Sequence, residues 1–124
     1  MRKSQATRQQ RKYDQAEVYI QKGLALAQQL GLPQIVLNAL YEYGNLRLDQ
    51  QQIEVAEGKF REMLRTTPDG RQDLLALAHY GLARTAAAQN NLDEARRLGE
   101  GSVTSLEKMG HYKAQEVRDW LRTI

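Results

Sequence analysis

A small residue recurs at a nearly constant spacing along this chain, and no other feature restricts the possible fold as strongly. Ala16, Ala56 and Ala95 lie 40 and 39 residues apart in three similar segments. These segments are residues 12–28, 51–68 and 90–107. A fixed period of this length is the sequence signature of stacked supersecondary units, each of which buries its apolar face against its neighbours. We therefore expect a repeat fold.

Each segment has the apolar spacing of an α-helix. Ala56, Phe60 and Leu64 follow one another at steps of four residues, which places their side chains on one helix face. Similar helices precede the last two segments, within residues 32–48 and 73–88. We call the preceding helix of each pair the A helix, and the segment that carries the alanine the B helix.

Small residues in the A helices predict where the two helices of a pair cross. Gly44 and Ala83 each precede the alanine of the following B helix by 12 residues. Antiparallel helices can approach closely only where neither carries a bulky side chain. We therefore expect Gly44 to pack against Ala56 and Ala83 against Ala95, with Ala16 as the corresponding residue of the first B helix.

The third B helix departs from this pattern at Gly99. Ile20 and Phe60 occupy the corresponding positions of the other two B helices. The C-terminal segment has the apolar spacing of one more A helix, but no B helix follows it. We expect Trp120 or Leu121 of this terminal helix to fill the space that Gly99 leaves.

Composition favours an all-α protein. Ala, Leu, Gln, Glu and Arg are frequent, and these residues lose little conformational freedom in a helix. Cysteine is absent, which excludes disulfides and thiolate metal sites. The apolar runs are too short to span a membrane and the polar N-terminus differs from a secretory leader, so we expect a cytoplasmic protein. Polar turns are expected at residues 49–52, 66–70, 89–91 and 108–111.

The formal charge of +3 is unevenly distributed. Five basic residues precede the first acid, Asp14, and the rest of the chain has 13 basic and 15 acidic residues. We therefore divide the chain into a basic polar arm, residues 1–12, and a helical repeat domain, residues 13–124. The arm is either a solvated extension of the first B helix or the end of a helix truncated from a longer protein, and we favour the second interpretation.

The helix pairs resemble the tetratricopeptide repeat over residues 13–124. The resemblance depends on a small residue in A, an alanine 12 residues later in B, an aromatic four residues beyond it and a proline that ends B, as in Ala56, Phe60 and Pro68. It implies an α-solenoid of antiparallel helix pairs, with about three repeats and a terminal capping helix. The resemblance also implies that a peptide or a partner helix binds on the concave face, which the A helices line.

Several positions depart from the tetratricopeptide pattern. The period exceeds the usual length, Leu40 and His79 stand where a tryptophan is frequent, and Gly99 replaces the aromatic of B. The longer period resembles the long-helix variety in kinesin light chains and, more closely, the C-terminal repeats of bacterial signalling ATPases of the NB-ARC or STAND type. That resemblance implies a sensor or partner-binding region of a larger regulatory protein, with the ATPase upstream.

The sequence gives little support for catalysis. It has no GxxxxGK phosphate loop and no HExxH motif, and His79 and His111 are its only histidines. We interpret His79 as a core or rim residue and His111 as a helix-terminus residue. We therefore expect no enzymatic activity, no cofactor and no metal site.

The expected function is protein–protein interaction through the concave face. Asn45 and Arg84 are the first candidates, because each follows the small residue of its A helix by one position and both can hydrogen-bond to a peptide. Tyr41 stands where members that clamp a terminal carboxylate have lysine. The full candidate set is Asn38, Tyr41, Glu42, Asn45, Asp49, Leu77, Tyr80, Arg84 and Ala88.

Two other interpretations remain open. The concave residues can simply solvate a surface inherited with the fold. Alternatively, the basic arm can bind nucleic acid as part of a transcription-regulatory helical domain, although clustering on a folded face would be needed for many phosphate contacts. Because an array that ends in apolar helix faces tends to cover them, we also expect self-association through a terminus.

Overall fold

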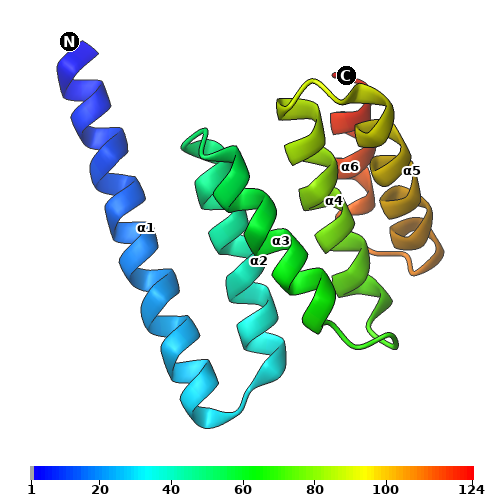
Figure 1. Cartoon of the computed structure of the whole chain (residues 1–124), viewed down its shortest axis with the longest axis horizontal. Coiled ribbons are helices and arrows are strands. Elements are labelled where there is room, and N and C mark those ends of the chain that lie inside the picture. The colour runs from blue at the N-terminus through cyan, green and yellow to red at the C-terminus, as the bar shows by residue number, and fades with distance from the viewer. Residues whose placement is uncertain (1) are drawn as a thin grey trace.

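The computed structural model describes residues 2–124, with side chains from Arg8 onward, and within this range the chain forms six α-helices and no β-strand (Figure 1). The all-helical prediction is therefore confirmed. The helices are α1 (Arg2–Leu30), α2 (Pro33–Asp49), α3 (Ile53–Thr66), α4 (Gln72–Ala88), α5 (Leu92–Lys108) and α6 (Ala114–Leu121).

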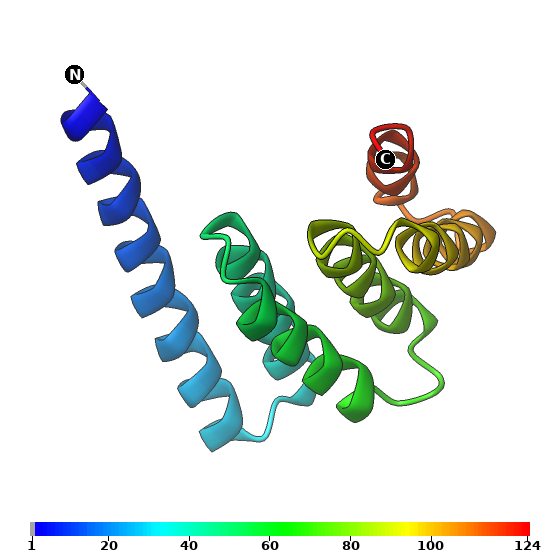
Figure 2. The same ribbon diagram turned by 45° about the horizontal axis from the view of Figure 1, so that its top comes forward.

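Each helix packs against the next helix in the chain, and α2 also packs against α4. The successive helices run up and down beside one another, and the turned view of Figure 2 separates α6 from α5. The rings of Tyr80 on α4 and Trp120 on α6 lie 5.7 Å apart, edge to face, so α6 also reaches α4. The A helices α2, α4 and α6 are thus neighbours, although a B helix separates each pair in the sequence.

The four predicted turns lie between the helices that they were expected to join. Four of the five connections contain one residue with positive φ: Gly31 (68°), Gln51 (60°), Asn90 (64°) and Gly110 (63°). A residue in this left-handed conformation ends a helix by satisfying its last carbonyl groups. Gln51 and Asn90 lie 39 residues apart, so the corresponding turns of two units have the same backbone conformation.

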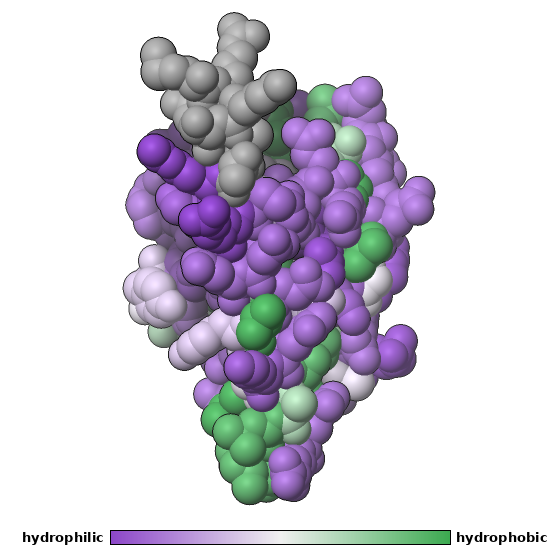
Figure 3. Space-filling model, turned by 90° about the vertical axis from the view of Figure 1, so that its left-hand side faces the viewer, coloured by the Kyte–Doolittle hydropathy of each residue, from purple (hydrophilic) through white to green (hydrophobic). Residues whose placement is uncertain are grey.

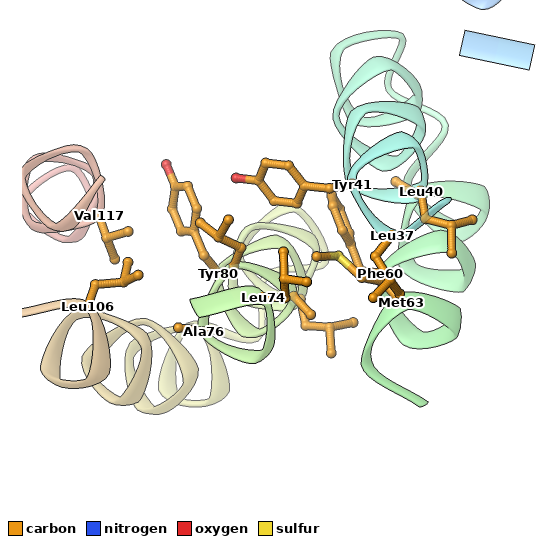
Figure 4. Packing of buried hydrophobic residues seen from close by; sticks show 14 of the residues in the cluster. Leu37, Leu40, Tyr41, Phe60, Met63, Leu74, Ala76, Tyr80, Leu106 and Val117 are labelled. Carbon is orange, nitrogen blue, oxygen red and sulfur yellow. The ribbon is translucent and has the colours of Figure 1, made fainter. Parts of the chain in front are cut away.

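Phe60 is the centre of the first half of the core. Its side chain is fully buried between α2 and α4, both of which present a glycine to the ring (Figure 4). A Cβ atom on Gly44 would lie 2.6 Å from the ring Cε1, and one on Gly81 would lie 2.3 Å from Cδ1. Ala56 is also fully buried. The close neighbour of Gly44 is therefore the Phe60 ring, one helical turn beyond the alanine that we expected it to face.

Side chains of α6 fill the space beside Gly99, as the sequence predicted. A Cβ atom on Gly99 would lie 2.8 Å from Cδ2 of Leu121 and 2.9 Å from Cζ3 of Trp120. Ala83 on α4 and Ala95 on α5 have no exposed surface. Their complete burial agrees with a close crossing of α4 and α5.

Helix α1 runs without a break through the boundary between residues 12 and 13. The Tyr13 hydroxyl donates a hydrogen bond of 3.4 Å to the carbonyl oxygen of Asp49, the last residue of α2. The residues before Tyr13 therefore extend past the end of α2. Ala16 is half-buried, unlike the other small residues of the crossings, and from Arg8 onward Ala27 (2% exposed) is the residue of α1 that packs most deeply.

Candidate functional site

Two buried tyrosines from neighbouring A helices pack against Arg84 and Trp120, which line an open groove between α2, α4 and α6. We call this groove the hollow and the two tyrosine rings below Arg84 its floor. Tyr41 on α2 and Tyr80 on α4 lie 39 residues apart, and in Figure 4 the Tyr41 ring extends from α2 toward the Tyr80 side chain. The Tyr41 ring packs against Phe60 with centroids 5.9 Å apart, and the Tyr80 ring packs against Trp120. The same aromatic rings therefore support both the core and the base of the hollow.

Arg84 lies over this aromatic floor and contacts Asn45. Its guanidinium carbon is 4.2 Å from the centre of the Tyr80 ring, at a distance that gives a cation–π interaction. Its Nη2 donates a hydrogen bond of 2.7 Å to Oδ1 of Asn45. The two residues that the sequence placed first as ligand contacts are therefore in direct contact, one from α4 and the other from α2.

Arg84 differs from the other half-buried arginines in its partner. From Arg8 onward, four arginines are half-buried, and three of them form ion pairs with a carboxylate: Arg47 with Glu17, Arg71 with Asp73, and Arg118 with Glu107. Within the same part of the chain, Arg84 makes no such pair, and its Nε is buried without a hydrogen-bond acceptor. A partly desolvated cation without an anion is unfavourable, so this position favours a negatively charged ligand.

Burial keeps both tyrosines of the floor protonated. It raises the pKa of Tyr80 to about 12, and the nearby charge of Arg84 opposes this only in part. Burial also raises the pKa of Tyr41, against the opposing charges of Arg84 and Lys113. Lys113, the residue before α6, lowers the pKa of Tyr41, and Glu116 on α6 raises the pKa of both tyrosines. The charged atoms of Lys113 and Glu116 lie 3.6 Å apart. At neutral pH the floor therefore presents hydroxyl groups and no phenolate.

An open groove leads from the end of α2 across α4 to α6. It has a volume of about 490 Å³. Its walls are Leu48, Gln51, Ile53, Arg84, Ala88 and Trp120. An apolar groove with one cation in its wall suits a peptide that places an apolar side chain beside an acidic group.

The remaining candidate residues are dispersed. Asn38 lines a separate groove of about 440 Å³ at the start of α2, together with Ile35 and other residues. Glu42 and Asp49 are exposed outside both grooves, and Leu77 (8% exposed) belongs to the core. Only part of the predicted set, with Arg84 at its centre, forms one site.

The sequence interpretation did not include the contribution of α6 to this hollow. Glu116 and Trp120 belong to α6 and Lys113 precedes it; from the sequence we interpret this segment as one more A helix that fills the space at Gly99, and assign none of its residues to the concave face. Their signal was available in the spacing of residues 114–124, because one more A helix must lie beside α4 and continue the same inner face.

Neither histidine lines the groove beside Arg84. His79 is half-buried on α4, and burial, with a smaller effect of the nearby Arg97, lowers its pKa. Nδ1 of His111 accepts a hydrogen bond of 3.1 Å from the backbone N–H of Lys113, immediately before α6. Over the described part of the chain, no three His, Cys, Asp or Glu side chains gather as metal ligands would.

Comparisons with known proteins found no relative. No family model, no curated protein and no solved structure matches this chain. Among the helices of residues 2–124, none combines the length and the apolar character that a membrane span requires.

Proposed function

We propose that the chain is an α-solenoid of the tetratricopeptide type and acts as a protein-interaction module. Three features support this proposal: the period of 39 to 40 residues, the packing of every helix against its successor, and the contact between α2 and α4. Stacked units of this kind expose one continuous surface made of A helices, which suits an extended peptide or a partner helix.

We further propose that the hollow between α2, α4 and α6 holds an acidic side chain of the partner. The observation that carries this proposal is Arg84, the half-buried arginine whose side-chain partner is the amide of Asn45 rather than a carboxylate. A ligand carboxylate would replace water on the guanidinium and form a charge-assisted hydrogen bond. Trp120 and Ile53 would contact an adjacent apolar side chain in the groove.

The amide of Asn45 has a second role in this proposal. Its oxygen accepts from Arg84 and fixes the guanidinium, and its NH₂ group, one hydrogen of which faces the Tyr41 hydroxyl, has a second hydrogen for a peptide carbonyl. Tyr41 stands where a terminal-carboxylate clamp would have lysine, so an internal Asp or Glu fits this site better than a free C-terminus. The role needs no catalytic group, and we propose that it serves a larger cytoplasmic regulatory protein.

Peptides selected by phage display against the full chain test this proposal. We expect the selected sequences to share an acidic residue next to an apolar one. Arg84→Ala should weaken their binding at least tenfold, and Arg84→Lys by less. The matched control is Arg61→Ala on α3, where the side chain is 65% exposed and paired with Glu57. Circular dichroism would verify that each variant remains helical.

The result that would overturn the proposal is equally specific. If the selected peptides lack acidic residues, or if Arg84→Ala and Arg61→Ala bind them as tightly as the unaltered chain, the hollow is not the peptide site. Selection of no peptide at all, from libraries that yield binders to other helical repeat proteins, would count against the interaction module itself.

A further inference from the structure

The outer face of α1 exposes a row of apolar side chains. Tyr19 is 82% exposed, and Val18, Leu26 and Leu30 are 50%, 55% and 60% exposed. In Figure 3 apolar side chains gather at the lower end of this face, where α1 turns into α2. Ile35 (48% exposed) continues the apolar surface onto α2. Aliphatic and aromatic side chains of this size, gathered on one face, are typical of an interaction surface.

One cation, Lys22, lies among these apolar residues on the same helix face. Lys22 lies three residues after Tyr19 and four before Leu26, which places all three side chains in one row. The exposed basic residues of α1 from residue 8 onward are Arg8, Arg11, Lys12 and Lys22.

Carboxylates are scarce on this outer face. From residue 8 to the end of α1 there are two: Asp14 accepts a hydrogen bond of 3.0 Å from Gln10, and Glu17 faces α2, where it pairs with Arg47. The face is therefore apolar from Val18 to Leu30 with Lys22 in its row, and its other exposed cations lie on the earlier part of α1, before Asp14.

Helix α6, at the other end of the array, has the opposite character. Its apolar side is buried at Ala114 and Val117, and its solvent face carries Gln115 and Asp119, the second of which forms an ion pair of 3.5 Å with Arg122 just after the helix. The exposed face of α6 is therefore polar, whereas the outer face of α1 exposes apolar side chains.

We propose that the outer face of α1 docks an acidic amphipathic helix of a partner protein. The apolar row Val18, Tyr19, Leu26 and Leu30 would pack against the apolar seam of that helix. Lys22 would face an Asp or Glu side chain beside the seam, and Arg8, Arg11 and Lys12 would face acidic residues where the partner helix extends past Val18. This surface lies on the opposite side of α2 from α4 and does not depend on the function proposed for the hollow.

Charge and chemistry favour this occupant over two others. In a second copy of α1, the cations of each helix would meet another predominantly basic face and would find few carboxylates. A nucleic acid would neutralise the cations but would leave Leu26 and Leu30 uncovered, because phosphates and sugars offer aliphatic side chains little contact. An acidic helix satisfies both parts of the surface.

Two synthetic helical peptides test the proposal on the full chain. Both carry leucine at every third and fourth position, and one carries Glu on the flanks where the other carries Lys. We expect the acidic peptide to bind at least tenfold more tightly than the basic one, by fluorescence polarisation, with an affinity that falls as salt increases. Lys22→Glu should reduce this preference at least tenfold, and Leu26→Ser should weaken binding of the acidic peptide.

The control variant is Arg122→Glu, directly after α6, which makes the same charge change on an exposed side chain far from α1 in the fold. It should leave both affinities unchanged. Peptides selected for the hollow should bind the Lys22→Glu and Arg84→Ala variants differently, retaining affinity only for the first, so failure of either proposal is seen separately.

Three results would overturn the acidic-helix proposal. Equal binding of both peptides, or of neither, would remove the charge argument. A dimeric light-scattering mass that Leu26→Ser converts to a monomer would make a second copy the occupant. Duplex DNA binding that exceeds binding of the acidic peptide and is lost in Lys22→Glu would make a nucleic acid the occupant.

Discussion

The α2–α3–α4 junction and the α4–α5–α6 junction place a large side chain against glycine, but from opposite helices. At the first junction the B helix α3 supplies Phe60, and the A helices supply Gly44 and Gly81. At the second, the B helix α5 supplies Gly99, and the A helix α6 supplies Trp120 together with Leu121. Both junctions therefore use the same kind of contact, but the large side chain comes from the B helix at the first and from the A helix at the second.

The reversal has a consequence for how firmly each junction is held. Phe60 has no exposed surface and is held by helices on both sides, each continuous with further structure. Trp120 and Leu121 are half-buried on a helix of eight residues at the end of the described chain. We therefore expect the first junction to resist change in volume more strongly than the second.

Phe60→Ala is the substitution with the largest expected effect. Loss of a fully buried ring leaves a cavity between α2, α3 and α4, at a cost of about 3 to 5 kcal/mol. Trp120→Ala should cost less, because its ring is partly exposed already and α6 can adjust. Urea unfolding followed by circular dichroism measures both changes. Equal costs would show that the terminal junction is as rigid as the internal one.

Gly81→Ala should overpack the first junction. Its new methyl group would meet the Phe60 ring at 2.3 Å, where neither the ring nor the two helices can move easily. We expect a loss of about 1 to 3 kcal/mol, even though alanine favours a helix. Gly58→Ala on α3 is the control, because no atom lies within 4 Å of its Cβ position and the substitution should stabilise by about 0.5 to 1 kcal/mol.

A second substitution distinguishes crowding from other causes. If the Phe60 ring is the obstacle, Phe60→Leu should recover part of the stability that Gly81→Ala loses. Equal losses for Gly81→Ala in the presence of phenylalanine and of leucine would show that the ring is not responsible, and a stabilising Gly81→Ala would contradict the packing directly.

Alkaline stability compares the tyrosines of the two junctions. The pKa of Tyr80 is raised by burial to about 12 in the folded chain, whereas an unfolded tyrosine ionises near pH 10. Below about pH 10 the tyrosine is protonated in both states, so the free energy of unfolding does not depend on its ionisation. Between about pH 10 and 12 only the unfolded state loses the proton, so the free energy of unfolding falls by at most about 1.4 kcal/mol per pH unit.

The test is the slope of stability against pH above 10 in Tyr80→Phe and Tyr41→Phe, each measured by urea unfolding. Each substitution should reduce the slope, because burial raises the pKa of both hydroxyls. An unchanged slope in Tyr80→Phe would mean that its hydroxyl reaches solvent in the folded chain.

The helix pairs and their turns could be predicted because they depend on local signals. The 12-residue offset from Gly44 to Ala56 locates two helices and the turn between them. The offset shows that a position must be small, but it does not show which side chain lies against it. Gly81 falls outside the offset, and for that reason its contact with Phe60 was not predicted.

The candidate site was predictable only in part, for a similar reason. Asn45 and Arg84 were found because they occupy equivalent positions in two A helices, and equivalent positions of stacked units lie side by side. The lack of a carboxylate beside Arg84 depends on which residues every neighbouring helix brings near it, and a repeat pattern does not contain that information. The effects of Lys113 and Glu116 on the two tyrosines depend on the same tertiary contacts, and for that reason they were not predicted either.

Gly99→Ala gives the smallest expected effect and the sharpest comparison of the two junctions. Its methyl group would meet only the ends of the Leu121 and Trp120 side chains, at 2.8 and 2.9 Å. A small shift of α6 relieves this contact, and the gain in helix propensity of up to about 1 kcal/mol offsets the remainder. We expect a change within about 0.5 kcal/mol, accompanied by a shift in Trp120 fluorescence.

Gly101→Ala is the matched control, because it lies on the same helix with no atom within 4 Å of its Cβ position. It should stabilise the chain without altering Trp120 fluorescence, so the difference between the two variants measures the contact with α6 alone. If Gly99→Ala instead destabilises as much as Gly81→Ala, α6 is held as rigidly as α3. The reversed junction would then be as unyielding as the first, and the direction of insertion would have no influence on stability.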